Sequence, residues 1–325
     1  MNHFFNLGFF PTPIEELKNL SELYPDYRIF TKRDDQTGLA TGGNKTRKLE
    51  YLIQDALDNY ADTIISAGAQ QSNHCRQTAA AAAKAGLQCH LVLGGDQPSE
   101  FTGNLLMNKL LGAKIHFMGE NRKGEDIPRL AKALKDEGKN PYIIPYGGSN
   151  SIGALGYVRA INELKDQMDH SGLDFDYIYF ASSSGGTHAG MLMGKELFKL
   201  ESKIIGIQID KDEINGLTLE QNILKIIEES ADRLRSDYNF TPEDVRLLDD
   251  YEKPGYGVLT EKEENAIKLL AQEEGILLDP VYTGRAFYGM MDQIENQKIK
   301  AGSSVLFWHT GGFPATFNYL TQLSK

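Results

Sequence analysis

Short runs of β-branched and aromatic residues alternate along the chain with longer stretches whose apolar residues recur at helical spacing. The short runs predict strands at residues 63–66, 89–93, 114–117, 142–145, 177–181, 203–209 and 304–308. The longer stretches predict helices at residues 72–85, 105–111, 127–137, 152–168, 188–200, 217–235, 261–274 and 285–297. Strands and helices that alternate in this order indicate an α/β fold with a mainly parallel sheet.

Several of the predicted strands end in turns rich in small residues. Glycines follow three of them, at positions 68, 94–95 and 147–148, and a Ser/Gly segment at residues 182–186 follows a fourth. Open α/β sheets bind their ligands at the loops after the carboxyl ends of the strands. We therefore expect the functional residues in these loops.

Composition and charge narrow the class of protein. With 325 residues, 41% of them hydrophobic and 24% charged, the chain can bury the core of one large domain or two ordinary ones. A net charge of −11 and a pI near 5.2 argue against a nucleic acid or an anionic membrane as the main partner. The sequence has two cysteines, no signal-peptide pattern, no apolar run of membrane-spanning length, and no paired spacing among its seven histidines. We expect a cytoplasmic enzyme with a small-molecule substrate and no catalytic metal.

Residues 181–190, Ala-Ser-Ser-Ser-Gly-Gly-Thr-His-Ala-Gly, lie between a predicted strand and a predicted helix. Small residues let consecutive backbone N–H groups converge on an anion, the hydroxyls of Ser184 and Thr187 add donors, and the following helix contributes its positive end. No Lys or Arg occurs between Asp176 and Gly194, which favours one compact phosphate over a triphosphate with its magnesium. The alternative is a merely flexible loop.

Lys45 follows a glycine pair and Asn44 at the start of a probable helix. A lysine that is desolvated or crowded by other cations has a lowered pKa and can attack a carbonyl group, whereas an ordinary lysine here would be solvated. Counted from Gly38, the segment nearly matches the nucleotide-binding loop G-x-x-x-x-G-K-T. Asn44 adds one residue, and residues 31–36 read as a charged turn where the motif requires a strand. We therefore reject a nucleotide hydrolase.

Residues 66–74, Ser-Ala-Gly-Ala-Gln-Gln-Ser-Asn-His, lead from a strand end to a helix start. Ser72 and Asn73 are good helix N-caps, and this role alone could explain them. Alternatively, the free N–H groups of the helix and the Ser72 hydroxyl hold a substrate carboxylate, while Asn73 binds a ring hydroxyl. A reactive lysine, a phosphate loop and a carboxylate site together fit a pyridoxal phosphate enzyme.

Six separated motifs follow one another along the chain: TGGNKTRKLEYL at residues 41–52, QSNH at 71–74, SGGTHAG at 184–190, GYG at 255–257, DPVYTG at 279–284 and HTGG at 309–312. In this order they resemble the D-cysteine desulfhydrase and 1-aminocyclopropane-1-carboxylate deaminase family, and the similarity runs from residue 11 to the C-terminus. The resemblance implies fold type II of the pyridoxal phosphate enzymes, with open, mainly parallel twisted sheets and helices on both faces. It also implies a large domain at residues 1–46 and 159–325, a small domain at 47–158, a cofactor in the cleft, and a homodimer.

The resemblance assigns a role to each matching residue. Lys45, rather than Lys48, matches the lysine that binds the cofactor covalently and later carries the proton at Cα. Ser72 matches the serine at the substrate carboxylate, and Asn73 the residue at the phenolic oxygen of the cofactor. The other matches are the phosphate loop at Ser184, Gly185, Gly186 and Thr187, the active-site tyrosines Tyr256 and Tyr282, and the substrate-side or cofactor-side residues Gln71, Thr283 and Thr310. One tyrosine would pack on the pyridine ring, and either can move a proton.

Two positions sort substrates within the family. The deaminases resemble Pro-Val-Tyr-Glu-Gly at the first and tend to be apolar at the second, where this chain has Thr283 and Thr310. A carboxylate near the pyridine nitrogen would keep it protonated and strengthen the electron sink, which a threonine hydroxyl cannot do. The pair favours α,β-elimination in D-amino acid catabolism, with D-cysteine giving pyruvate, ammonia and hydrogen sulfide. Alternatives are the cyclopropane amino acid, L-cysteate or a β-substituted D-alanine as substrate, and a noncatalytic binder of the cofactor or an amino acid.

Overall fold

Two open sheets organise the chain in the computed structural model, which describes residues 3–121, 123–210, 213, 216–234 and 239–324. Within these residues the larger sheet has six strands, in the spatial order β1 (Ile14–Glu16), β2 (Arg28–Arg33), β10 (Ser304–His309), β7 (Tyr177–Ser182), β8 (Lys203–Gln208) and β9 (Leu247–Leu248). The smaller has four, in the order β5 (Lys114–Phe117), β4 (Gln88–Leu93), β3 (Thr63–Gly68) and β6 (Pro141–Ile143). Among these strand pairs β1–β2 is antiparallel and the others are parallel.

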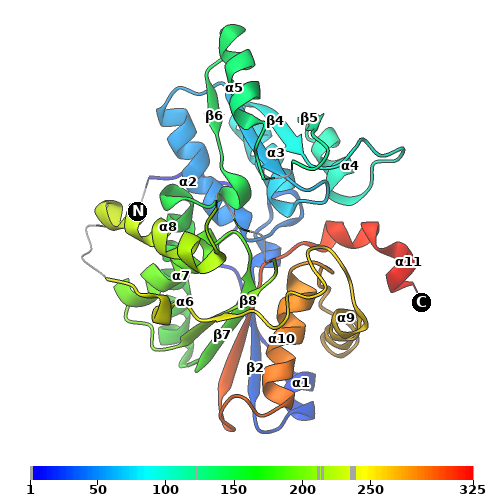
Figure 1. Ribbon diagram of the computed structural model, residues 1–325. Coiled ribbons are helices and arrows are strands. Elements are labelled where there is room, and N and C mark those ends of the chain that lie inside the picture. The colour runs from blue at the N-terminus through cyan, green and yellow to red at the C-terminus, as the bar shows by residue number, and fades with distance from the viewer. Residues whose placement is uncertain (1–2, 122, 211–212, 214–215, 235–238, 325) are drawn as a thin grey trace.

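Helices connect the strands and cover both sheets. In chain order they are α1 (Lys18–Leu23), α2 (Lys45–Asp58), α3 (Asn73–Ala85), α4 (Gly103–Leu110), α5 (Ile127–Asp136), α6 (Ser151–Ser171), α7 (Gly186–Leu197), α8 (Leu219–Leu234), α9 (Glu261–Glu274), α10 (Thr283–Glu295) and α11 (Leu320–Leu323). Figure 1 shows the smaller sheet with α3, α4 and α5 at one end of the molecule and the larger sheet at the other. The predicted α/β class and the mainly parallel sheets are confirmed; the predicted helix end at residue 235 lies outside the described residues.

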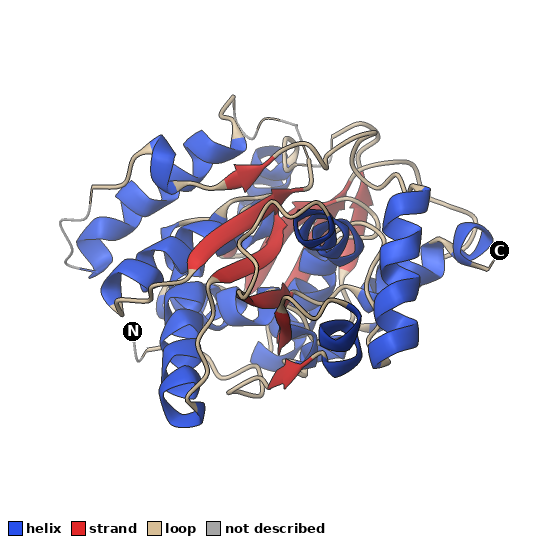
Figure 2. Cartoon of the chain, turned by 90° about the horizontal axis from the view of Figure 1, so that it is seen from below, coloured by secondary structure: helices blue, strands red, loops and turns tan. Residues whose placement is uncertain are grey.

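The larger sheet is buried on both faces, and β10 shows why. Leu306 and Trp308 pack into a core with α6, α7 and α8, while Val305 and Phe307 pack into a second core with α1, α9 and α10. Successive side chains of a strand point to opposite faces, so a strand covered on both sides has an unbroken apolar run. Figure 2 shows the helices on either side of the strands.

The smaller sheet is also covered on both faces. Ile64, Leu91 and Leu93 pack against α2, α3 and α4, whereas Ile65 and Val92 face α5. The second half of α2 belongs to this core through Leu49, Leu52, Ile53 and Ala56. This helix therefore connects its first turn, next to the larger sheet, to the core of the smaller one.

The pattern did not predict β1, β2 and β9, and it was wrong to read the charged residues 31–33 as a turn, because they end strand β2. Lys32 is fully buried in that strand. Its Nζ donates to Glu163 Oε1 and Gln167 Oε1, both at 2.6 Å, and to the Thr12 carbonyl at 2.7 Å. A charge with such partners can occupy a buried strand position that local sequence reads as polar.

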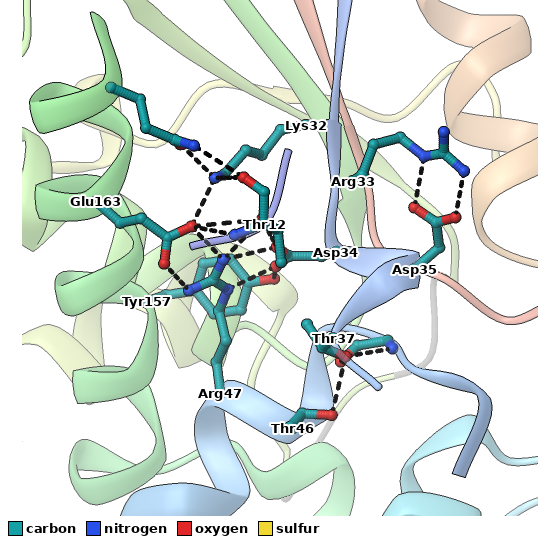
Figure 3. A network of polar contacts seen from close by, with 12 residues as sticks. Thr12, Lys32, Arg33, Asp34, Asp35, Thr37, Thr46, Arg47, Tyr157 and Glu163 are labelled. Carbon is teal, nitrogen blue, oxygen red and sulfur yellow. Dashed lines mark hydrogen bonds and ion pairs between the residues drawn. The ribbon is translucent and has the colours of Figure 1, made fainter. Parts of the chain in front are cut away.

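Lys32 is one member of a buried charge cluster, which we define as Thr12, Lys32, Asp34, Arg47, Tyr157, Glu163 and Gln167 (Figure 3). Arg47 lies at its centre: Nε and Nη2 each donate to Asp34 at 2.8 Å, and Nη1 and Nη2 each donate to Glu163 at 2.9 Å. Tyr157 donates to Asp34 Oδ2 at 2.7 Å. Burial raises the pKa of the Asp34 carboxyl, but the charges of Arg47 and Lys32 and the hydrogen bonds from Arg47 and Tyr157 together lower it to about 2. The cluster fixes the first turn of α2 to β2 and α6.

Candidate active site

A cavity of about 620 Å³, its open side included, lies at the carboxyl ends of β7 and β10, between the first turns of α2, α3 and α7. The lining residues are Asn44, Lys45, Ser72, Asn73, His74, Tyr146, Gly147, Ala181, Ser182, Ser183, Ser184, Gly185, Thr187, His188, Tyr282, Thr310 and Gly311. The loops that follow the strand ends thus come together, as the topology of open α/β sheets requires.

Lys45 is the first residue of α2, and its partly exposed side chain lines the cavity. Gly42 has φ of 73°, and a Cβ there would lie 1.9 Å from the Asp35 carbonyl oxygen, so the turn that presents Lys45 requires glycine. Among the described residues Nζ of Lys45 has no hydrogen-bond partner. Burial lowers the pKa of this amine from 10.5 to about 8, which increases the neutral, nucleophilic fraction near neutral pH.

The Ser/Gly segment forms the turn into α7. Gly185, the N-cap, has φ of 85°, and α7 begins at Gly186, whose N–H donates to Ser149 Oγ. Ser184 Oγ lies 2.8 Å from Ser149 Oγ, and Thr187 Oγ1 accepts from Asn44 Nδ2 at 3.2 Å. Hydroxyls and helix N–H groups therefore converge where the sequence predicted an anion site. Asn44, the residue that breaks the nucleotide-loop motif, bonds to this site.

Lys48 lies behind the predicted anion site, a position that sequence reasoning did not assign. Its buried Nζ donates to the Gly147 carbonyl at 3.0 Å and to Ser149 Oγ at 2.9 Å. Ser149 in turn accepts from the N–H of Gly186 at 3.1 Å. Burial, and then the charge of Lys45, lower the pKa of Lys48 well below its usual range. The signal was the three-residue spacing from Lys45, which puts both lysines on one side of the helix.

Helix α3 begins at the opposite wall. Its N-cap Ser72 accepts from the N–H of Cys75 at 3.2 Å, so the predicted cap is confirmed, and both Ser72 and Asn73 line the cavity. Asn73 Oδ1 accepts from Arg76 Nη1 at 3.1 Å and from Asn104 Nδ2 at 2.8 Å. A second helix N-terminus thus opens into the cavity, backed by a buried arginine that the sequence did not single out.

The two predicted tyrosines lie in contact but in different positions. Tyr282 lines the cavity, and its hydroxyl lies 2.7 Å from that of Tyr256, which is outside the lining. Burial, and then the charge of Tyr256, raise the pKa of Tyr282 well above its usual range, so its phenol stays protonated. Thr310 lines the cavity, and its carbonyl accepts from the N–H of Asn44 at 3.0 Å.

Two predicted substrate residues have side chains engaged elsewhere. Gln71 accepts from the N–H of Asn104 at 2.9 Å and donates to the Thr102 carbonyl at 3.2 Å. The buried Thr283 hydroxyl donates to Asp279 Oδ1 at 2.8 Å and accepts from the N–H of Asp279 at 2.8 Å. Neither residue belongs to the lining. Both support the walls of the cavity through hydrogen bonds to neighbouring segments.

The charged residue that lines the cavity is basic. The described lining contains Lys45 and no Asp or Glu. Burial lowers the pKa of His188 to about 3 and, with Lys45 and Lys48, lowers that of His74 well below its usual range, so both rings are neutral. The described part of the chain has no cluster of three metal-ligating side chains and no helix that could cross a membrane. The cavity is therefore suited to an anionic ligand.

The chain belongs to the family of pyridoxal-phosphate dependent enzymes, whose sequence pattern matches residues 5–311. It is 42% identical over 318 residues to the D-cysteine desulfhydrase of Serratia proteamaculans (strain 568), covering 96% of this chain and 94% of that one. It is likewise 42% identical over 323 residues to the D-cysteine desulfhydrase of Klebsiella pneumoniae (strain 342), covering 96% and 95%. Among solved structures, one described as an ACC deaminase homologue matches with a TM-score of 0.90 and 38% identity over 99% of this chain and 95% of that one. The predicted family, fold class and cofactor are confirmed.

Proposed function

We propose that this protein is a pyridoxal phosphate-dependent lyase that carries out α,β-elimination on D-cysteine, releasing pyruvate, ammonia and hydrogen sulfide. Two D-cysteine desulfhydrases that are 42% identical over nearly their whole length support the substrate. The observation that carries the proposal is the position of Lys45. Its amine has a lowered pKa and lies between two helix N-termini that open into one cavity.

The residues present fit the cofactor. The turn into α7, with Ser184, Gly185, Gly186 and Thr187, offers N–H and hydroxyl donors to a phosphate, and behind them lies the Lys48 amine, whose charged form a bound anion would favour. Lys45 offers an amine to the carbonyl carbon, and Asn73 lies on the opposite wall for the phenolic oxygen. When bound, pyridoxal phosphate supplies the electron sink that stabilises negative charge at Cα.

The protein's own groups then bind the substrate and move its protons. The N–H groups at the start of α3 and the Ser72 hydroxyl, whose proton is not used in the cap, hold the substrate carboxylate. Lys45 takes the Cα proton, the Cβ–S bond breaks with its electron pair on sulfur, and the thiolate leaves as hydrogen sulfide after protonation. The remaining three-carbon enamine takes up water and gives pyruvate and ammonia. Tyr282, which stays protonated and touches the cavity, is the proton donor for sulfur, and Tyr256 acts behind it.

We also propose the arrangement around this chemistry. A large domain at residues 1–46 and 159–325 carries the phosphate loop and the tyrosines, and a small domain at 47–158 carries Ser72 and Asn73. Closure of the small domain on a bound carboxylate excludes water from the reacting atoms. The active form is a cytoplasmic homodimer that serves D-amino acid catabolism.

One side-by-side assay tests the substrate. Purified protein is given D-cysteine, L-cysteine, D-serine, L-cysteate and 1-aminocyclopropane-1-carboxylate, and pyruvate, ammonia and the cofactor absorbance are followed. We expect pyruvate and hydrogen sulfide from D-cysteine at the highest kcat/KM. A yellow protein that turns over none of the five compounds would instead be a noncatalytic binder.

The second candidate is 1-aminocyclopropane-1-carboxylate deaminase, favoured by the structural match at a TM-score of 0.90. Against it, Thr283 supplies no carboxylate, and its hydroxyl is bonded to Asp279. Faster consumption of the cyclopropane amino acid than of D-cysteine would overturn the interpretation of Thr283 and Thr310. The variants Thr283→Glu and Thr310→Leu would then leave the preference unchanged.

A further inference from the structure

Arg76 is a buried cation behind the wall that carries Asn73. Its side chain is fully buried, and Nη2 donates to the carbonyl of Gly42, in the turn before Lys45, at 2.7 Å. Its Nη1 donates to Asn73 and to Asn104 Oδ1, the latter at 2.6 Å, while Nε has no partner in the described structure. Three hydrogen bonds of this guanidinium thus reach neutral oxygens, and burial lowers the pKa of Arg76 to about 10.

The arginine determines which way two amide side chains point. Arginine has donors and no acceptor, so the atoms that Nη1 meets on Asn73 and Asn104 must be their oxygens. With its oxygen held by Arg76, Asn104 turns Nδ2 toward Asn73 Oδ1 at 2.8 Å and the Gln71 carbonyl at 2.8 Å. Both acceptor directions of Asn73 Oδ1 are then occupied, and its Nδ2, without a partner in the described structure, is left for the cavity.

We propose that Arg76 and Asn104 are positioning residues that make Asn73 present N–H donors, and not its oxygen, to the cavity. A guanidinium charge on the oxygen side of the amide also withdraws electrons from its nitrogen and strengthens it as a donor. The matching ligand group is an anionic oxygen. Given the proposed function, on which this inference rests, that oxygen is the phenolic oxygen of pyridoxal phosphate, kept ionised by the donor.

The variant Asn104→Asp tests the orientation with almost no change in shape. A carboxylate cannot donate to Asn73 Oδ1, and it pairs with Arg76, so the Asn73 amide reverses and turns its oxygen to the cavity. We expect roughly 10- to 100-fold weaker pyridoxal phosphate binding, and a rise of roughly one to two units in the pH at which the absorbance of the bound cofactor changes. Both are measured without substrate, by fluorescence titration and by absorbance.

Asn108→Asp is the matched control, because Asn108 is also a fully buried amide of α4 but has no bond to Arg76. It should leave the absorbance titration where the wild type has it. Other titratable groups near the cavity are unchanged in the wild type and in both variants: Lys45, Lys48, His74 and Asp279. A difference in the absorbance titration between the two variants therefore reports the orientation of the Asn73 amide.

A second variant, Arg76→Lys, keeps a charge but loses the fork that joins the two amides, bonded to Nη1, to the Gly42 carbonyl, bonded to Nη2. It should shift the titration in the same direction by less than Asn104→Asp. The inference fails if Asn104→Asp binds cofactor with the wild-type spectrum and titration, or, where that variant does not fold, if Arg76→Lys does so. A wild-type protein that binds the cofactor normally but does not act on D-cysteine would overturn the proposed function and leave this inference standing.

Discussion

The first turn of α2 carries three basic residues within four positions, and their partners differ between the two sides of the helix. Arg47 points into the buried charge cluster, where Asp34 and Glu163 meet its guanidinium (Figure 3). Lys45 and Lys48 face the other way, and in the described structure neither has a carboxylate within ion-pair distance. A buried charge without a partner is costly. On the cluster side the protein supplies the counter-charges itself, whereas on the cavity side a bound anionic ligand would supply them.

The largest effect should come from removing the amine on the cavity side. Lys45→Met is expected to lower kcat by on the order of 10³-fold or more, because both covalent attachment of the cofactor and proton transfer at Cα are lost. Pyruvate release gives the rate, and circular dichroism checks the fold. Lys225→Ala, an exposed lysine of α8, should keep wild-type activity. If borohydride reduction and peptide mapping placed the pyridoxyl group on Lys48, the assignment of Lys45 would be wrong.

On the cluster side the effect should appear in stability. Arg47→Leu leaves the buried Asp34 and the partly buried Glu163 without their main counter-charge, and the free energy of unfolding of the apo-protein should fall by about 3–5 kcal/mol. Urea unfolding measures it. The control Arg129→Leu breaks the ion pair between Arg129 and Asp126, in which the arginine side chain is 70% exposed. It should change the free energy of unfolding by less than about 0.5 kcal/mol. Equal losses in the two variants would remove the contrast between the sides.

Lys48→Met separates the two sides most directly. Loss of its bonds to Gly147 and Ser149 is offset by removal of an unpaired buried charge, so the stability of the apo-protein should change by no more than about 1 kcal/mol. The affinity for pyridoxal phosphate should fall by roughly 10- to 100-fold, since a charge-assisted contact to an anion is lost. A loss of apo-protein stability as large as that of Arg47→Leu would show that Lys48 serves the fold and not the ligand.

The smallest effect is a dependence of stability on pH. The pKa of Lys45 is lowered from 10.5 to about 8 on folding, so between these values the unfolded chain binds more protons than the folded one. Stability must therefore rise with pH across this window. The apo wild type should gain stability relative to Lys45→Met from pH 8 to 10.5, measured by urea unfolding at each pH. A constant difference would mean that the amine is not desolvated.

The parts of the molecule that could be predicted are those set by local order. Apolar runs predicted the covered strands, and the order of strand, small-residue loop and helix pointed to the loop with Ser184 and Thr187, which lines the cavity. That this loop binds an anion stays a prediction. Strand β2 was not predicted, because its buried Lys32 is stabilised by a hydrogen-bonded ion pair with Glu163, which is 131 residues away in the sequence. The positions of Lys48 and Arg76 beside the cavity were not predicted, for a related reason. Their function depends on partners that only the folded chain brings near.

Gln71 and Thr283 show the opposite limit. The motifs that contain them pointed to the substrate, and the roles assigned to them stay predictions. Their side chains are hydrogen-bonded to Asn104 and Asp279. A sequence motif does not reveal this, because it gives the type of each residue and not the direction in which its side chain points. A loop residue beside an active site can thus act on the ligand through the wall it supports.

Helix α2 has a mechanical consequence. Its first turn is fixed by Arg47 to the larger sheet, and α6 approaches so closely that a Cβ on Gly156 would lie 2.2 Å from the Arg47 carbonyl oxygen. Its second half is embedded in the core of the smaller sheet. A rotation of one sheet against the other that kept both of these contacts would pivot near this turn. In such a rotation Lys45, in the first turn of α2, would move least. Ser72 and Asn73, at the start of α3, would move further.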